Sequence, residues 1–201
     1  MNRLAILLSG RGSNFTAIAQ ALREGHLRGA EICVVVSNRE DAPGLRSARE
    51  LGLAAMALPS AGRKRGEHDA EMIAILRRHE VDLVCLAGYM RLLSPAFVQA
   101  FPGRILNIHP SLLPAFPGLE AQQQALLHGA KITGCTVHFV DEELDHGVIV
   151  LQRTVPVEDA DTVDILSGRI LEQEHIAYTE AIERVLNGQY EVRGRRYLRK
   201  A

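Results

Sequence analysis

Two polar side chains interrupt an apolar run in the segment Asn107-Ile108-His109-Pro110. If this run is a strand, alternation places Asn107 and His109 on the same side of it. An amide donates hydrogen bonds to a developing oxyanion, and an imidazole donates or shuttles a proton near neutral pH. The pair therefore suits an acyl transfer that passes through a tetrahedral intermediate. The alternative for such a triplet is a capping asparagine beside a surface histidine.

Two carboxylates later in the chain have chemistry that would assist this pair. Acyl transfer to an amine needs a group that orients the histidine and takes up the proton that the attacking nitrogen loses. Asp145, in the Leu-Asp-His-Gly connection between two late strands, is the leading candidate, and an Asx-turn residue is the alternative. Glu174 falls on the otherwise apolar stripe of a long helix, so its carboxylate needs a partner. Ribose hydroxyls and a buried salt bridge fit that position equally well.

The loop Ser9-Gly10-Arg11-Gly12-Ser13-Asn14 joins the first apolar run to the first helical pattern. Backbone N–H groups and the positive end of a helix hold anions at such a turn. The dinucleotide fingerprint needs a third glycine where Phe15 stands, and the Gly-Lys-Ser/Thr of a P-loop is missing. The loop therefore indicates a phosphate site that is not a dinucleotide site, with a tight turn capped by serine or asparagine as the alternative.

The elements that must position these residues alternate between strand-length apolar runs and helix-length amphipathic segments. The expected strands are 4–8, 32–36, 54–58, 83–87 and 105–108, and the expected helices between them are 14–23, 43–51, 68–79 and 95–101. Continuous apolar strands indicate a parallel sheet covered on both faces. Two closely spaced strands, 133–140 and 148–157, and a long helix over 161–187 follow. The pattern predicts an α/β fold with a doubly wound, mostly parallel sheet, antiparallel late strands and a long C-terminal helix.

Composition limits the classes of partner. The 201 residues carry a formal net charge of -1, which offers no positive field for nucleic acid or an anionic membrane. Three cysteines stand singly in apolar runs, as buried thiols of a reducing compartment do, and no stretch is long enough to span a membrane. We therefore expect a cytoplasmic protein with small-molecule substrates. A metal is not expected, because the eight histidines show no HExxH or clustered Cys/His spacing.

Four separated motifs closely resemble those of the phosphoribosylglycinamide formyltransferase family over essentially the whole chain. They are SGRGSN, LAGYMRLLSPAFV (residues 86–98), NIHPSLLPAFPG (107–118), and TVHFVDEELDHG leading into VLQ and QEH. The resemblance implies a Rossmann-like formyltransferase fold in one domain, 1–201, with a phosphate-binding half (1–100) and a folate-binding and catalytic half (101–201). It also implies transfer of a formyl group from the co-substrate 10-formyltetrahydrofolate to the primary amine of glycinamide ribonucleotide in purine biosynthesis. A homodimer is left open.

The resemblance implies roles for individual residues. Asn107 and His109 would stabilise the oxyanion, and Asp145 would hold the histidine and assist proton transfer. The substrate would be bound by Gly12, Ser13, Asn14, Gly88 and Glu174. The folate would be bound by Arg65, Met90, Arg91, Leu92, Leu93, Asn107, Val140 and Asp145. The Leu113-Pro114 peptide is a candidate cis bond.

The chain departs from the family's pattern near Asp145. His146 stands where the family often has a small residue, and Val148 replaces a frequent proline, which leaves the geometry of this loop open. Methionyl-tRNA formyltransferase and formyltetrahydrofolate hydrolase share parts of the motifs and are the alternative enzymes. A non-catalytic folate or nucleotide binding module is a further alternative.

Overall fold

Strand β1 (Asn2–Leu8) lies at the centre of a parallel sheet in the first of two compact units, Met1–Asn107. In this computed structural model, which describes residues 1–200, every side chain from position 4 to position 8 is completely buried. A strand that is apolar at each position, rather than at alternate positions, needs cover on both faces of its sheet. The continuous apolar run at the start of the chain therefore has its structural explanation in this central position.

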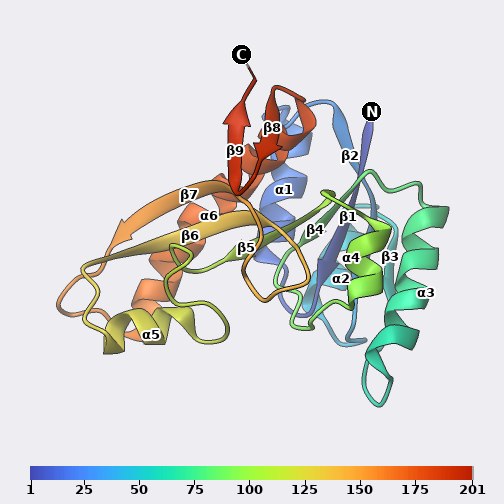
Figure 1. The fold of residues 1–201 in the computed structure, drawn as a ribbon. Helices are drawn as coiled ribbons and strands as arrows, with labels where there is room; N and C mark the ends of the chain where they lie inside the picture. The colour runs from blue at the N-terminus through green and yellow to red at the C-terminus, as the bar shows by residue number, and fades with distance from the viewer. Residues whose placement is uncertain (201) are drawn as a thin grey trace. The chain divides into compact units, whose positions relative to one another are not determined.

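The strand order is β3-β2-β1-β4-β5, all neighbours are parallel, and the last of these strands begins in the first unit and ends in the second. The strands beside β1 are β2 (Ala30–Ser37), β3 (Ala55–Ala57), β4 (Leu83–Leu86) and β5 (Ile105–His109). The helices are α1 (Ser13–Glu24), α2 (Pro43–Glu50), α3 (Arg65–Arg78) and α4 (Pro95–Ala100). Because crossover connections are right-handed, the reversal of direction at β1 puts α1 and α2 on one face and α3 and α4 on the other. In agreement, α1 packs with α2 and α3 packs with α4 (Figure 1).

The second unit, Ile108–Ala201, is built around one long helix and an antiparallel pair of strands. Its elements are α5 (Ala121–Leu127), β6 (Ile132–Phe139), β7 (Ile149–Pro156), α6 (Val163–Leu186), β8 (Tyr190–Arg193) and β9 (Arg196–Arg199). Helix α6 packs on both β6 and β7 (Figure 1), and its inward side chains Ile170, Ala177 and Ala181 are completely buried. Strands β8 and β9 form a small hairpin at the C-terminal end.

The predicted α/β fold, mostly parallel with antiparallel late strands and a long C-terminal helix, is confirmed. Predicted helix ends are also confirmed. The Ser94 hydroxyl accepts a hydrogen bond from the Phe97 N–H, and the Thr162 hydroxyl accepts one from the Ile165 N–H. Gly25 ends α1 in the left-handed conformation. The division into one domain with halves 1–100 and 101–201 stays a prediction; the two compact units meet at residues 107 and 108.

Some expectations differ from the structure. Helix α5 and the β8–β9 hairpin were not predicted, because Glu120 begins α5 in a left-handed conformation without a side-chain cap and the hairpin strands have four residues each. Helix α3 begins at Arg65, three residues before the expected start. All three cysteines are free, but Cys33, the fourth of the eight residues of β2, is only partly buried.

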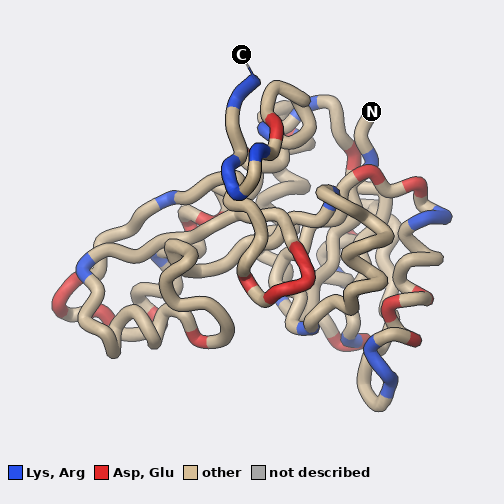
Figure 2. The backbone as a smooth tube through the Cα atoms, viewed as in Figure 1, with Lys and Arg blue, Asp and Glu red and all other residues tan. Residues whose placement is uncertain are grey.

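Charged residues of both signs are spread along each unit (Figure 2). Within residues 1–200, none of the helices combines the length and the apolar character that a membrane crossing requires.

Candidate active site

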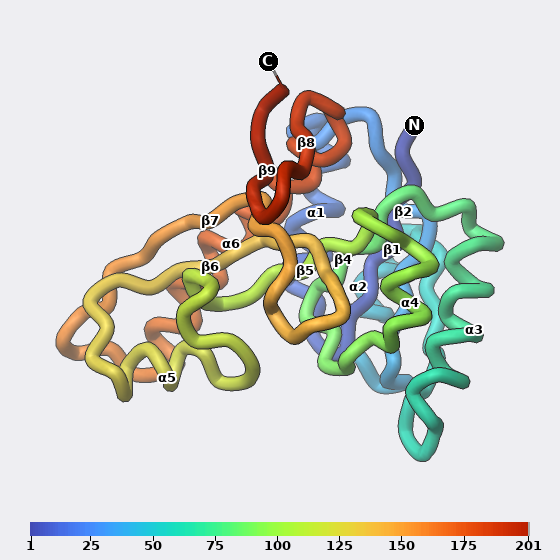
Figure 3. The backbone as a smooth tube through the Cα atoms, viewed as in Figure 1, coloured from blue at the N-terminus to red at the C-terminus, as the bar shows by residue number. Residues whose placement is uncertain are grey.

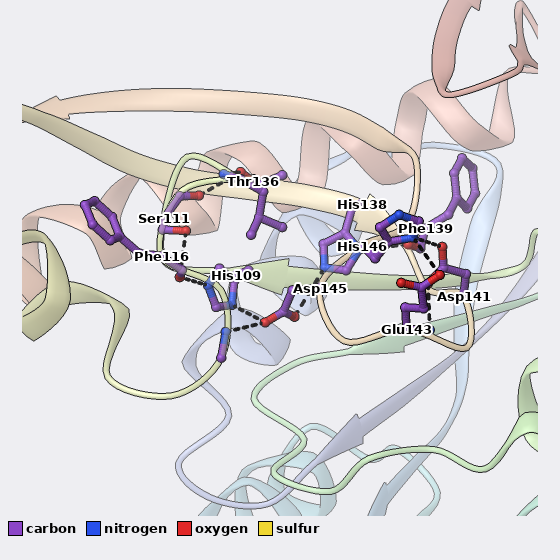
Figure 4. Close-up of polar contacts among 12 residues, drawn as sticks. His109, Ser111, Phe116, Thr136, His138, Phe139, Asp141, Glu143, Asp145 and His146 are labelled. Carbon is purple, nitrogen blue, oxygen red and sulfur yellow. Dashed lines mark hydrogen bonds and ion pairs between the residues drawn. The ribbon is translucent and has the colours of Figure 1, made fainter.

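His109 and Asp145 come together in the second unit. His109 ends β5, Asp145 lies between β6 and β7, and both side chains are more than 90% buried. The His109 Nδ1 atom is 3.4 Å from Asp145 Oδ2, and His109 Nε2 is 2.9 Å from the Phe116 carbonyl oxygen (Figure 4). These two contacts, one on each ring nitrogen, hold the imidazole in one orientation. A histidine beside a carboxylate is the arrangement that proton transfer at a reacting amine needs.

A second imidazole approaches the same carboxylate. His138 Nε2 lies 3.8 Å from Asp145 Oδ1, and His138 Nδ1 donates to the Phe139 carbonyl oxygen at 2.8 Å. Burial lowers the pKa of His138 below its ordinary value, against the opposing effects of the Phe139 carbonyl and Asp145. His138 is therefore neutral at neutral pH, and its side chain points toward Asp145 (Figure 4).

Asp145 itself has an unusual backbone. Its φ of 50° lies in the left-handed region, which few residues other than glycine adopt. Its Oδ2 atom accepts a hydrogen bond of 2.8 Å from the Gly118 N–H, in addition to its contact with His109. The loop that follows β5 thus helps to aim the carboxylate. Strain at one residue, compensated by fixed contacts, is common at reactive sites.

The loop after β5 is held by buried hydroxyl groups. The Ser111 hydroxyl donates to the Ala115 carbonyl oxygen at 2.5 Å. Thr136, on β6, donates to the Ser111 carbonyl oxygen at 2.7 Å and accepts from the Leu113 N–H at 3.0 Å. The Leu113-Pro114 peptide is cis, as predicted. These contacts fix the segment that supplies both Phe116 and Gly118 to the site.

In the first unit, Ser9 connects the predicted phosphate loop to the predicted folate segment. The Ser9 hydroxyl accepts from the Met90 N–H at 2.8 Å and donates to Asn38 Oδ1 at 2.5 Å. The Ser9 N–H donates to the carbonyl oxygen of Gly88 at 3.0 Å. These contacts join the ends of β1, β2 and β4 at the point where the strand order reverses, which is where open α/β sheets bind ligands.

The start of α1 lacks the side-chain cap that its sequence suggested as an alternative. Gly12 occupies the N-cap with a φ of 73°, and no side chain accepts from the first turn. A Cβ atom at Gly12 would lie 3.1 Å from Leu8 Cδ2 and 3.3 Å from the Cα of Gly44, so the close packing also favours glycine. Ser13 and Asn14 thus lie in the first turn of a helix whose N-cap residue makes no side-chain capping hydrogen bond.

The remaining predicted ligand residues differ in exposure. Met90 is 72% exposed and Leu92 is 50% exposed, which is unusual for large apolar side chains. Arg91 donates to the carbonyl oxygens of Ser60 and Arg63. The side chain of Arg91 thus holds a neighbouring loop, and the exposed apolar surface comes from the residues beside it. Leu93 is partly buried.

Four further residues that were predicted to bind the substrate or the folate lie on different elements. Asn107 lies two residues before His109 on β5 and is partly buried, as is Val140, which directly follows β6. Glu174 is buried on α6. Burial of the Cys135 thiol, together with the negative charge of Glu174, raises the pKa of that thiol to about 12. Arg65 is exposed at the first residue of α3. The ligand roles of all these residues stay predictions.

Two residues at the site were not singled out from the sequence. His138 is the one imidazole in β6 and stands seven residues before Asp145, and its place in a buried strand was the signal available. Phe116 contributes only its carbonyl oxygen and has a φ of 53°, which no side-chain pattern indicates. Among residues 1–200, no group of three or more His, Cys, Asp or Glu side chains has the arrangement of a metal site.

Comparisons with known proteins show which family the chain resembles. The formyl transferase family model matches residues 2–182. The phosphoribosylglycinamide formyltransferase of Escherichia coli is 44% identical over 187 residues, which are 92% of this chain and 88% of that protein. The crystal structure of glycinamide ribonucleotide transformylase 1 from Symbiobacterium toebii has a TM-score of 0.96 and 50% identity, covering all of this chain and 95% of the other.

Longer relatives contain a similar segment. The trifunctional purine biosynthetic protein adenosine-3 of Drosophila melanogaster is 44% identical over 189 residues, which are 92% of this chain. The chain spans 14% of the length of that relative. The family resemblance and the formyltransferase fold inferred from the sequence are thus confirmed. The chain belongs to the phosphoribosylglycinamide formyltransferases, within the formyl transferase family.

Proposed function

We propose that the chain transfers the formyl group of 10-formyltetrahydrofolate to the primary amine of glycinamide ribonucleotide, a step of de novo purine biosynthesis. The observation that carries this function is the buried pair of His109 and Asp145, held 3.4 Å apart at the end of β5 in a member of this family. The products are N-formylglycinamide ribonucleotide and tetrahydrofolate.

The chemistry assigns a role to each member of the catalytic set. The amine nitrogen attacks the formyl carbon, and the carbonyl oxygen becomes an oxyanion that Asn107 and His109 stabilise by donating hydrogen bonds. The nitrogen then loses a proton, the bond between the formyl carbon and N10 of the folate breaks, and N10 gains a proton. Asp145 holds the imidazole and assists the movement of the proton between the two nitrogens.

The substrates have separate binding regions in this proposal. The uncapped start of α1 binds the substrate phosphate through Gly12, Ser13 and Asn14, near Gly88. Glu174 accepts hydrogen bonds from the ribose hydroxyls. Backbone atoms of residues 90–93 bind the pteridine ring, with Val140 and Arg65 as further folate contacts.

The direct test is a transfer assay with both substrates. Purified protein, His109→Ala and the control His26→Ala are each mixed with 10-formyltetrahydrofolate and glycinamide ribonucleotide, and the formylated amine and the deformylated folate are both measured. His26 is exposed and lies at the end of α1, so its removal leaves transfer intact. We expect His109→Ala to lose at least about a hundredfold in kcat.

The alternatives give different results in the same assay. Formate release that does not require the amine would identify a formyltetrahydrofolate hydrolase. Folate binding with no turnover would identify a binding module. Tight, salt-sensitive binding of tRNA at low salt would favour a methionyl-tRNA formyltransferase, although a net charge of -1 argues against an RNA substrate.

A further inference from the structure

The loop that carries Asp145, residues 140–148, is fixed at its base. The Phe139 N–H donates to the Val148 carbonyl oxygen at 2.9 Å. Gly147 passes so close to β6 that a Cβ atom there would lie 1.7 Å from the Phe139 carbonyl oxygen. Glu142, Glu143 and Leu144, at the far end of the loop, are exposed. The position of Asp145 therefore depends on what holds the loop between its base and its exposed end.

Arg195, in the turn of the β8–β9 hairpin, reaches this loop from the C-terminal end of the chain. Its Nη1 atom lies 2.8 Å from His146 Nε2 and 3.3 Å from His146 Nδ1, against the imidazole ring, and its Nη2 atom donates to the His146 carbonyl oxygen. Figure 3 shows the turn of the hairpin beside the loop between β6 and β7. One guanidinium thus holds both the side chain and the backbone of the residue that follows Asp145.

The contact continues through His146 to Asp141. His146 Nδ1 lies 2.8 Å from Asp141 Oδ2. Because a carboxylate oxygen accepts, the Nδ1–H of His146 donates to Asp141. The charged groups that face His146 are Asp141 and Glu143 from its own loop and Arg195 from the hairpin. The basic hairpin and the acidic loop are adjacent in Figure 2.

The hairpin is itself anchored to the second unit. The ring of Tyr197 stacks on Tyr190 with centroids 5.2 Å apart and meets the ring of Phe139 edge-on at 5.5 Å. The Tyr197 hydroxyl donates to the Arg184 carbonyl oxygen at the end of α6. Arg195 is therefore attached to a fixed support, and it is not a freely moving surface side chain.

We infer that Arg195 is a positioning residue for formyl transfer, which holds His146 and thereby fixes the direction of the Asp145 carboxylate toward His109. This inference rests on the proposed function of the same site. Single exposed contacts contribute little, but the planar guanidinium makes two contacts to one residue, next to a backbone in a left-handed conformation.

The test compares Arg195→Ala with Arg193→Ala. Arg193 lies in the same hairpin and carries the same charge, but its Nε donates to Glu191 on its own strand at 2.6 Å. Two readouts are measured for each variant: hydrogen exchange of the amides in residues 140–148, and kcat with separate KM values for the two substrates. Arg195→Ala should raise exchange in the loop by about fivefold, raise the folate KM, lower kcat by roughly three- to tenfold, and leave the KM of the ribonucleotide unchanged.

The control and a conservative variant decide between the outcomes. Arg193→Ala should change none of these quantities, and Arg195→Lys should restore only part of the loss, because an ammonium cannot reproduce the planar pair of donors. Unchanged loop exchange in Arg195→Ala, equal effects in the two alanine variants, or full rescue by lysine would overturn the inference. If the parent protein transfers no formyl group, the proposed function fails, whereas the exchange measurement still tests the contact of Arg195 with the loop.

Discussion

At the scale of single residues, the candidate site depends on one carboxylate with several partners. Asp145 contacts His109, lies beside His138 and accepts from the Gly118 N–H. These contacts come from three separate segments of the chain, so the orientation of the carboxylate is determined by the fold. A role in holding an imidazole needs its negative charge, whereas the contact with Gly118 needs only an acceptor.

Asp145→Asn separates these two requirements. The amide keeps the shape and can still accept from Gly118, but it has no charge to hold a protonated His109. We expect kcat to fall by about a hundredfold or more, with a change in the free energy of unfolding of no more than about 1 kcal/mol. Steady-state kinetics and urea denaturation of the same preparation measure both quantities. A variant that keeps more than half of the parent's kcat would exclude Asp145 from proton transfer.

Some of these residues could be predicted from the sequence, and others could not. Asn107, His109 and Asp145 could be singled out because each has a side chain suited to acyl transfer at the end of a strand or in a connection. His138 and Arg195 act through neighbours brought close by the antiparallel pairing of β6 with β7 and by the C-terminal hairpin. No spacing in the sequence indicates contacts of that kind.

At the scale of elements, predictions succeeded where the apolar pattern is strong, whether it is continuous or periodic. Strand β1 and helix α6 have strong apolar patterns, and their expected positions agree with the structure. Helix α5 begins after a left-handed Glu120, and the β8–β9 hairpin is only half-buried, so neither has a clear pattern. Tertiary packing, rather than local preference, specifies these elements.

The close approach of α2 to the phosphate loop leads to a prediction at this scale. Gly44 donates to the Gly10 carbonyl oxygen at 3.0 Å, and a Cβ atom there would lie 2.8 Å from Leu8 Cδ2 and 3.1 Å from that oxygen. Gly44→Ala should displace the loop, raise the KM of glycinamide ribonucleotide by roughly three- to tenfold and cost about 1–2 kcal/mol of stability. The folate KM should change less. Equal shifts in both KM values would contradict a local effect on the phosphate loop.

A glycine on α6 provides the opposite case. Gly168 is exposed within the helix, and a Cβ atom there would have no neighbour within 4 Å. Gly168→Ala should raise the free energy of unfolding by about 0.5–1 kcal/mol, because alanine loses less conformational freedom than glycine in a helix. Thermal and urea denaturation measure this gain, and the kinetic constants should not change. A loss of stability would show that the exposed face of α6 has contacts that the fold does not indicate.

At the scale of the whole molecule, two histidines make folding stability depend on pH just below neutrality. Burial lowers the pKa of His138 and of His175 below the ordinary value of 6.5. In the unfolded chain both groups take up protons as the pH falls below about 6.5, whereas in the folded chain they do so only at lower pH. The unfolded state therefore binds more protons in this range. The contribution of these two histidines to folding stability is therefore fully present well above pH 6.5 and is lost as the pH falls toward their folded pKa values.

We expect the free energy of unfolding, measured by urea denaturation, to be lower at pH 5.5 than at pH 7.5. His138→Gln should reduce this difference, because glutamine does not titrate, even if the variant is less stable at both pH values. The matched control is His26→Gln, whose side chain is 74% exposed and should leave the difference unchanged. Carboxylates such as Asp161, whose hydrogen bond with Arg169 lowers its pKa, lose their contribution only at pH values below about 4 and do not affect this comparison. Equal pH dependence in the parent protein and His138→Gln would show that His138 is not the group whose burial destabilises the fold in mild acid.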